Sequence, residues 1–327
     1  MQVSLIIPTY RRVKDLDECL DSIIAQTKLP KEVIIVDDSE SNEIENLIEY
    51  RKDEFKEKSI LLRYIKNERE RSLTIARNIG IENAAGDIVL FLDSDVVLDV
   101  KYIEEILRVY KEKPYALGVQ GLIQGVKKEE RRTCFRNILG RLYFTSSFNE
   151  KNKCRVFPSL TVSYPDPSLD EIINCEWLSG ANQSYKKEIL EEFRWDENLK
   201  KYSGGEDLDL PYRIFKKYPS SLFTTPHAKL IHKASQEGRH LRREVIYMDV
   251  IYLTYLFYKN IDQSIKNKLI YLRSRIGRII FNIIVLIFKS KSKLTEIKYV
   301  LGAHFYCMRH IGEIKKGDLE FFNKGLR

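Results

Sequence analysis

Two aspartates one residue apart, Asp93 and Asp95, directly follow the run Asp87–Leu92, which is apolar from Ile88 onward. The run is predicted to be a buried strand, and ligands of open α/β sheets bind beyond the carboxyl ends of such strands. Carboxylate oxygens at that position suit Mg²⁺ or Mn²⁺, which often share their coordination with the phosphates of a substrate. Taken alone, the same residues are equally consistent with a polar turn that closes a strand.

The elements that would position these acids alternate between strands and helices. Strands are predicted at residues 3–8, 32–38, 61–65 and 87–92, with apolar residues at helical spacing between them. This alternation is typical of βαβ units, which build a mostly parallel sheet. Parallel pairing would bring three polar strand ends to one crevice. These ends are Pro8-Thr9, Asp37-Asp38 and Asp93-Ser94-Asp95.

Composition limits the class of protein. A chain of 327 residues with 43% apolar content can bury one large core or two ordinary ones. Its five cysteines are scattered without a C-x-x-C pair, which argues against a zinc site or a disulfide framework and for a reducing compartment. The sequence opens on a predicted strand at Val3 and shows no signal peptide. A cytoplasmic protein is therefore expected.

Positive charge is concentrated near the C-terminus, where residues 227–327 carry 20 Lys and Arg against 8 Asp and Glu. The runs Val245–Tyr258 and Ile276–Phe288 are apolar with basic flanks. Their longest uncharged stretches have 9 and 10 residues, whereas a membrane-spanning helix needs about 20. Two interpretations stay open: helices that lie on an anionic membrane surface, or helices that pack on the rest of the protein.

Seven motifs occur in an order that resembles the family 2 glycosyltransferases of the GT-A fold, over about residues 1–260. They are Val3–Tyr10, Val36-Asp37-Asp38-Ser39, Ala76-Arg77-Asn78 with Gly80, Asp93-Ser94-Asp95, Ser179-Gly180-Ala181-Asn182, Gly205-Glu206-Asp207 and Ala228–His232. The resemblance implies an α/β fold with a Rossmann-like, mostly parallel sheet flanked by helices.

The same resemblance suggests a division of the chain. Residues 1–239 would form the glycosyltransferase domain, with a nucleotide-binding half at about 1–120 and an acceptor-binding half at about 121–239. Residues 240–327 would form a basic and apolar helical extension. Within the second half, the segment 122–173 has an irregular pattern and is interpreted as a lid or a variable insertion.

The resemblance also implies roles for individual residues. Asp95 and His232 would hold Mg²⁺ or Mn²⁺, Asp207 would be the general base, and Trp177 and Glu206 would contact the acceptor. The nucleotide-sugar would be bound by Pro8, Thr9, Asp38, Arg77 and Asp93.

Each role has a physical reason and a simpler alternative. An acceptor hydroxyl is a poor nucleophile, so a carboxylate such as Asp207 must take its proton. A strand-end acid such as Asp38 can accept a hydrogen bond from a nucleotide base, and Arg77 offers a rigid fork of donors to acids or phosphates. The alternatives are a helix cap for Asp207, an Asx-turn for Asp38, an exposed helix position for Arg77, core packing for Trp177 and an ordinary hydrogen-bonded role for His232.

The implied activity is transfer of one sugar, with inversion, from a nucleotide-diphosphate sugar to an acceptor hydroxyl. With the basic C-terminal part, this suggests a lipid-linked or surface glycan as acceptor and peripheral contact with the cytoplasmic face of a membrane. A polyprenyl-phosphate sugar synthase is the first alternative. The second is an inactive nucleotide-sugar-binding or nucleic-acid-binding protein, although interleaved aliphatic runs suit lipid better than nucleic acid.

Four residues at three places depart from the family pattern. Arg11 stands where the family often has Asn, and Arg194-Trp195 replaces a common Gly-Phe. Pro211 falls in the helix expected after Gly-Glu-Asp, which it would disturb unless the helix starts late. The segment Glu191–Trp195 has Glu in place of the Gln of processive synthases and precedes Gly-Glu-Asp, so addition of a single sugar is expected.

Overall fold

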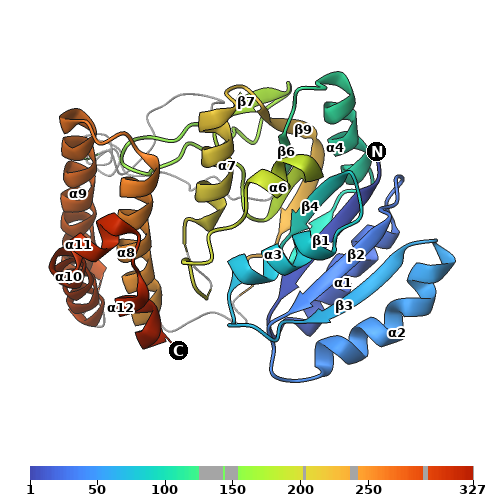
Figure 1. Cartoon of the computed structure of the whole chain (residues 1–327), viewed down its shortest axis with the longest axis horizontal. Coiled ribbons are helices and arrows are strands. Elements are labelled where there is room, and N and C mark those ends of the chain that lie inside the picture. The colour runs from blue at the N-terminus through green and yellow to red at the C-terminus, as the bar shows by residue number, and fades with distance from the viewer. Residues whose placement is uncertain (125–142, 144–153, 202–203, 236–241, 290–293, 327) are drawn as a thin grey trace. The chain divides into compact units, whose positions relative to one another are not determined.

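Strands and helices alternate through the first part of the chain in the computed structural model (Figure 1). The four strands predicted in this part are confirmed. In chain order the elements are β1 (Val3–Thr9), α1 (Val13–Ile24), β2 (Glu32–Asp37), α2 (Glu43–Glu57), β3 (Leu61–Lys66), α3 (Leu73–Asn83), β4 (Ile88–Leu92), β5 (Val96–Leu98), α4 (Tyr102–Glu112) and β6 (Gly118–Gln124). They are followed by β7 (Ile173–Cys175), β8 (Asn182–Lys186), α6 (Lys187–Glu192), α7 (Glu206–Lys217) and β9 (Leu222–His232).

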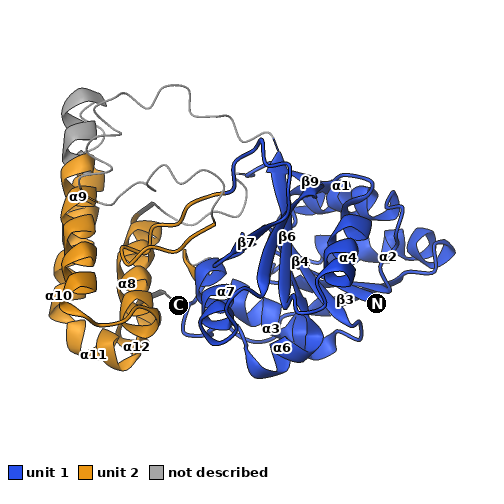
Figure 2. Cartoon of the chain, turned by 90° about the horizontal axis from the view of Figure 1, so that it is seen from above, with its two compact units in different colours: residues 1–126, 165–202, 206–239 blue, residues 127–164, 203–205, 240–327 orange. Residues whose placement is uncertain are grey.

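The structure describes residues 1–124, 143, 154–201, 204–235, 242–289 and 294–326. Contacts divide the chain into two units (Figure 2): unit 1 comprises residues 1–126, 165–202 and 206–239, and unit 2 comprises residues 127–164, 203–205 and 240–327. Within the segment predicted to be irregular, residues 125–142 and 144–153 lie outside the described part.

The sheet of unit 1 has nine described strands, in the order β3-β2-β1-β4-β8-β6-β9-β5, with β7 paired to β9. β1 pairs in parallel with both β2 and β4. β2 and β3 thus lie on one side of β1, and β4 lies on its other side. The strand order reverses at β1, which makes a topological switch point. Open α/β sheets bind ligands at such a point, beyond the carboxyl ends of the strands. Thr9 and Asp93 lie there, at the ends of β1 and β4.

Helices cover both faces of this sheet. Leu5 and Ile7 of β1 belong to the core that α1, α2 and α4 fill, whereas Ile6 contacts α3 on the opposite face. Gly80 permits this contact, because a Cβ atom there would lie 2.3 Å from Cγ2 of Ile6. Arg77 lies one helical turn before Gly80 in α3. The close packing of α3 on β1 therefore holds Arg77 at the carboxyl edge of the sheet.

The last strand of unit 1 brings a distant part of the chain to the same edge. β5 pairs antiparallel with β9, so that Val96 lies opposite His232. β9 is one strand with a shifted register against β6. Pro226 lies within the shifted part, and a proline has no N–H for the ladder.

Two departures from the family pattern have backbone consequences. Arg11 has a φ of 56°, in the left-handed region that Asn tolerates better than most residues. Pro211 lies inside α7, which begins at Glu206 and therefore does not start late. Because a proline has no N–H, the carbonyl of Asp207 lacks the helical hydrogen bond that residue 211 would otherwise donate.

Unit 2 is helical in its described C-terminal part. Its helices are α8 (Arg242–Asn260), α9 (Ile265–Lys289), α10 (Leu294–Arg309), α11 (Ile311–Lys316) and α12 (Glu320–Asn323). α8 packs against α10 and α11, and most of its apolar run, including Ile251, Tyr252 and Leu256, is buried. This run therefore contributes to a helical core. None of the described helices is long and apolar enough to cross a membrane.

Candidate active site

Asp93, Asp95 and His232 lie together at the carboxyl edge of the sheet. Each offers one ligand atom, and these atoms lie within 4.8 Å of one another. Nε2 of His232 is 3.2 Å from Oδ1 of Asp95 and 3.8 Å from Oδ2 of Asp93. The pairing of β5 with β9 produces this proximity, because it places the end of β9 beside the turn that follows β4.

Arg12, at the start of α1, is a further charged group at this cluster. Its Nη1 atom lies 3.3 Å from Oδ1 of Asp95, and the backbone N–H of Ser235 donates to Oδ2 of Asp95 at 2.8 Å. Burial alone would raise the pKa of Asp95, but the contact with His232 and the charge of Arg12 outweigh it and hold this pKa below its ordinary value. In return, Asp95 raises the pKa of His232.

The cluster suits a divalent cation. Two carboxylates are the kind of ligand that Mg²⁺ and Mn²⁺ prefer. Oδ1 of Asp95 is buried and makes its contacts without the geometry of a hydrogen bond, so a lone pair stays available to an ion. The pKa of Asp93 is raised by burial, although Arg77 and His232 oppose the shift. A cation placed among these oxygens would offset that cost of burial.

Arg77 connects this cluster to a second group of acids. The side chain is 1% exposed, which excludes the interpretation as an exposed helix arginine. Nη2 lies 3.5 Å from Oδ1 of Asp93 and donates to the carbonyl of Gly180 at 3.1 Å, while Nη1 lies 3.7 Å from Oε1 of Glu206. The guanidinium also lies over the ring of Trp195, 4.4 Å from its centroid. Nε and Nη1 are buried without a hydrogen-bond partner among the described residues.

Glu206 and Asp207 begin α7, after Gly205 with its φ of 99°. The backbone N–H of Gly180 lies 3.4 Å from Oδ2 of Asp207, to which it donates. Burial raises the pKa of both acids, and the neighbouring Asp207 carboxylate helps to raise that of Glu206 to about 8, although Arg77 acts in the opposite direction. Burial therefore disfavours the charged form of both acids, and Glu206 is largely protonated near neutral pH.

The strand ends beside β1 carry the residues expected at the nucleotide. Pro8 lies within β1, and the N–H of Asp38 donates to the carbonyl of Thr9 at 2.9 Å. The Thr9 hydroxyl is buried and has no hydrogen-bond partner in the described part of the chain. Burial raises the pKa of Asp38 to about 6, although Asn67 donates a hydrogen bond to it. The Thr9 hydroxyl thus lacks a partner among the described residues, and burial disfavours the charged form of Asp38 at the same edge.

Comparison with known proteins agrees with this arrangement. The sequence profile described as Glycosyl transferase family 2 matches residues 4–169, which is more than half of the 327 residues.

The chain belongs to glycosyltransferase family 2. It is therefore an enzyme, and the alternative of a binding protein without activity is set aside.

Two curated relatives of this glycosyltransferase illustrate how far the similarity extends. It is 27% identical over 195 residues to glycosyltransferase GlyA of Streptococcus pneumoniae, which covers 60% of this chain and 26% of that protein. It is 29% identical over 125 residues to the glucosyl-dolichyl phosphate glucuronosyltransferase of Haloferax volcanii, which covers 38% of each chain. The chain thus spans much less than two thirds of these relatives.

Solved structures show that the glycosyltransferase has the GT-A fold, as predicted. S. aureus TarS 1-349 in complex with UDP-GlcNAc superposes with a TM-score of 0.58 at 18% identity, over 93% of this chain and 79% of TarS 1-349. The mannosyltransferase PcManGT from Pyrobaculum calidifontis, in complex with GDP-Man and Mn²⁺, gives a TM-score of 0.53 at 15% identity, over 93% of this chain and 86% of that one.

The predicted site residues of the glycosyltransferase fall into three groups. Asp93, Asp95 and His232 form one cluster, and Arg77 joins it to Glu206 and Asp207. Among the described residues, no hydrogen bond or ion pair joins Thr9 or Asp38 to these groups. Trp177 is buried, with 2% of the residue exposed.

Sequence reasoning did not assign a role to Arg12 or to Trp195. Arg12 lies three residues after Thr9, the last residue of β1, so its position just beyond a strand end was a usable signal. Arg11 had the same signal, yet it is exposed and pairs with Glu40, and sequence cannot tell which of two adjacent arginines points inward. Trp195 lies more than one hundred residues from Arg77 in the chain, and its contact with the guanidinium depends on the tertiary fold.

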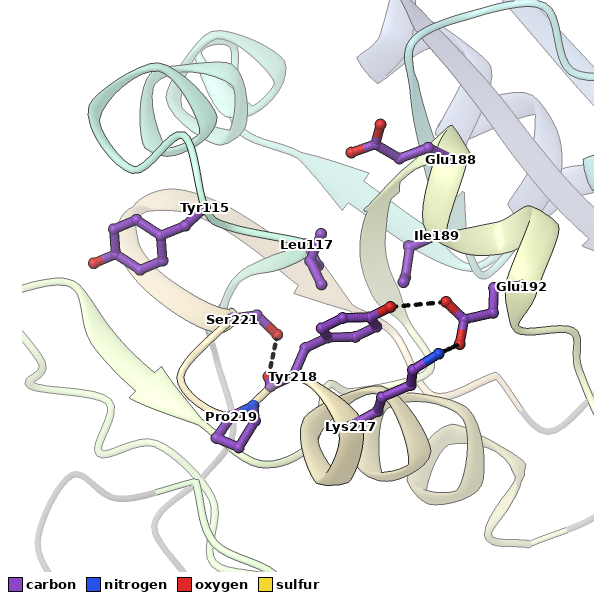
Figure 3. Close-up of a pocket in the computed structure, with 9 residues that line it drawn as sticks. All are labelled: Tyr115, Leu117, Glu188, Ile189, Glu192, Lys217, Tyr218, Pro219 and Ser221. Atoms are coloured by element: carbon purple, nitrogen blue, oxygen red, sulfur yellow. Dashed lines mark hydrogen bonds and ion pairs between the residues drawn. The ribbon is translucent and has the colours of Figure 1, made fainter.

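A pocket of about 600 Å³ lies at the other edge of the sheet of this glycosyltransferase (Figure 3). It is lined by residues that precede β6 and β9, together with residues of α6 and the end of α7. The carboxylate of Glu192 in this pocket accepts hydrogen bonds from Lys217 and Tyr218 of the protein itself. The pocket contains none of the predicted site residues, so the candidate active site stays at the carboxyl edge.

Replacing Asp95 by Ala is expected to weaken the binding of Mn²⁺ in the presence of a nucleotide diphosphate by about 10-fold to 100-fold or more. The change removes a candidate ion ligand whose pKa is held below its ordinary value by its surroundings. Titration calorimetry of Mn²⁺ with and without the nucleotide measures the loss. Asp99→Ala, an exposed acid four residues further along, is the control; equal losses in both variants would contradict the assignment.

Proposed function

We propose that this glycosyltransferase moves one sugar, with inversion and with the help of a divalent cation, from a nucleotide-diphosphate sugar to an acceptor hydroxyl. The observation that carries the proposal is the position of Arg77, which lies within 3.5 Å of Asp93 and 3.7 Å of Glu206. One guanidinium thus joins the cation-binding cluster to the acids of α7. Inverting transfer needs a leaving diphosphate and an activated hydroxyl on opposite sides of one carbon atom, and therefore needs two such groups close together.

On the donor side, Pro8, Thr9 and Asp38 are proposed to contact the base, and Asp93 the ribose or the sugar. Asp95 and His232 would hold Mg²⁺ or Mn²⁺, which supplies positive charge against the charge that develops on the leaving diphosphate. Arg77 has buried N–H groups that find no acceptor among the described residues, and these groups can donate hydrogen bonds to the nucleotide-sugar. The ligands of the neighbouring structures, UDP-GlcNAc in one and GDP-Man with Mn²⁺ in the other, support a donor of this class.

On the acceptor side, Asp207 is proposed to remove the proton of the attacking hydroxyl. Its carboxylate is held by the N–H of Gly180 and sits at the positive end of α7, which favours the ionised form. Glu206, whose pKa is raised to about 8, would be protonated near neutral pH and can donate a hydrogen bond to the acceptor. In this scheme residues 1–120 hold the donor and residues 121–239 hold the acceptor.

The acceptor is proposed to be a lipid-linked saccharide, presented at the cytoplasmic face of a membrane with which the protein makes peripheral contact. The basic composition of residues 227–327, with 20 Lys and Arg against 8 Asp and Glu, supports attraction to anionic lipid. The Haloferax volcanii relative is named for glucosyl-dolichyl phosphate, a lipid phosphate that carries a sugar, and this fits an acceptor of the proposed kind. No role in nucleic-acid binding is proposed.

A donor screen with released nucleotide diphosphate as the readout tests this function. One nucleotide-sugar is expected to turn over with Mg²⁺ or Mn²⁺, and a chelator is expected to stop the release. Turnover that is insensitive to the chelator would contradict the metal dependence. The acceptor is tested by offering a lipid-linked saccharide and, separately, a polyprenyl phosphate. Transfer to the phosphate alone would favour the sugar synthase, since a phosphate acceptor needs no general base.

A further inference from the structure

Helix α9 of unit 2 exposes a stripe of aliphatic side chains. The exposed fractions of Ile265, Leu269, Leu272 and Ile276 are 78%, 60%, 56% and 45%. Successive members are four, three and four residues apart, so they fall within an arc of about 60° around the helix. A continuous apolar stripe of this kind is unfavourable in water and indicates a surface that another phase or partner covers.

Basic side chains border the stripe on both sides. At about 100° per residue, Lys268 falls on one side of it, and Lys266 and Arg273 fall on the other. All three are exposed. Over its whole length α9 contains six Lys and Arg and no Asp or Glu. No acidic residue of the helix therefore neutralises the positive charge beside the stripe.

The opposite face of α9 is anchored in unit 2. The ring of Tyr271 stacks on Phe257 of α8 with centroids 4.1 Å apart, and its hydroxyl lies 3.0 Å from that of Thr254. Ser274 and Arg275 are buried on the same side. Because this packing fixes the rotation of the helix, the aliphatic stripe is held outward.

A shorter stripe of the same kind occurs on α10. Leu301, Phe305 and Met308 are spaced by four and three residues and are 46% to 66% exposed. Exposed Lys298 and Arg309 lie on the same helix. The combination of outward apolar residues and basic neighbours therefore recurs within unit 2.

The positive charge of α9 favours one of the possible binding partners of this face over the others. A second copy of the chain would bring two acid-free basic helices together, and like charges repel. Single-stranded nucleic acid is held through aromatic side chains that stack on bases, and the stripe on α9 has none. An anionic bilayer fits both features, since aliphatic side chains enter the acyl boundary while Lys and Arg reach the headgroups.

We propose that the face of α9 formed by Ile265, Leu269, Leu272 and Ile276 docks the protein on an anionic membrane surface, with the helix lying in the plane of the interface. The inference rests on the proposed function, since it gives a specific surface to the peripheral contact that a lipid-linked acceptor requires. It assigns membrane contact to a helix face on unit 2 that contains no residue of the candidate active site.

Cosedimentation of the full chain with vesicles tests this proposal. Wild-type protein is expected to bind vesicles of phosphatidylcholine mixed with phosphatidylglycerol and to bind pure phosphatidylcholine vesicles weakly. The double variant Leu269→Glu, Leu272→Glu is expected to lose at least about tenfold in partitioning. The variant Lys266→Gln, Lys268→Gln, Arg273→Gln is expected to lose binding mainly at low salt, by about fivefold for each charge removed.

The control is Tyr50→Glu, which changes a side chain of α2 that is 82% exposed, and it is expected to bind vesicles like the wild type. Circular dichroism confirms folding, and nucleotide release without vesicles is expected to be unchanged in all variants. Normal nucleotide release by a wild type that does not bind anionic vesicles would overturn the docking proposal and leave the proposed sugar transfer standing. Conversion of a dimer to a monomer by the double variant, with vesicle binding unchanged, would assign the face to a second copy instead.

Discussion

Asp207→Asn is expected to reduce sugar transfer by about 10² to 10⁴-fold or more while donor binding stays nearly unchanged. An amide cannot take a proton from the acceptor hydroxyl, so transfer should be lost, whereas Asp207 is not among the residues proposed to hold the nucleotide. Single-turnover transfer measures the first effect, and fluorescence or calorimetric titration of the donor measures the second.

The adjacent acid provides a matched control. Because the pKa of Glu206 is raised to about 8, Glu206 is largely protonated near neutral pH, and glutamine imitates that protonated state. Glu206→Gln is therefore expected to keep transfer within about tenfold of the wild type. Full turnover by Asp207→Asn, or a larger loss in Glu206→Gln than in Asp207→Asn, would refute the assignment of the base.

The pH profile separates loss of chemistry from loss of folding. Only the carboxylate form of Asp207 can act as a base, so kcat/KM should fall as the pH drops through its pKa, which burial places above the ordinary aspartate value. The sign is opposite for stability. An acid whose pKa is raised in the folded state costs stability as the pH rises, so Asp207→Asn should be at least as resistant to thermal unfolding as the wild type at pH 8.

The sequence supports prediction of the parts of the site that lie at strand ends. A short apolar run followed by acids, as in Ile88–Asp95, specifies both a buried strand and the edge where its acids emerge. The alternation of strands and helices indicates parallel pairing, which brings Thr9, Asp38 and Asp93 to that edge. These features depend on local hydrophobicity and on the general rule for parallel sheets, both of which are visible in a sequence.

Pairings between distant segments could not be predicted in the same way. His232 reaches Asp95 because Val96 pairs with His232 across an antiparallel contact, and no local pattern encodes that register. Arg77 was open to two interpretations because burial of a charged side chain depends on which carboxylates the fold places around it. In unit 2, the two apolar runs look alike in composition, yet the run in α8 is buried, whereas the exposed stripe of α9 begins before its run, at Ile265.

Arg77→Met is expected to lower the free energy of unfolding by about 3–5 kcal/mol at neutral pH, as is typical when one partner of a buried charge pair is removed. The substitution leaves Asp93 and Glu206 without the guanidinium that lies beside both of them. Urea unfolding followed by circular dichroism measures the loss. Arg108→Met is the control, because Arg108 is 41% exposed and pairs with acids on the surface of α4, where a change within about 1 kcal/mol is expected.

The pH dependence of this loss tests whether electrostatics or packing causes it. Arg77 lowers the pKa of Asp93 and of Glu206 against the effect of burial, so its removal should raise both values further. Acids with raised pKa values destabilise the folded state increasingly as the pH rises. The difference between Arg77→Met and the wild type should therefore shrink as the pH falls and the acids become protonated. A difference that stays constant with pH would mean that Arg77 acts through its packing on Trp195, and the link between the two acid clusters would then be steric and not electrostatic.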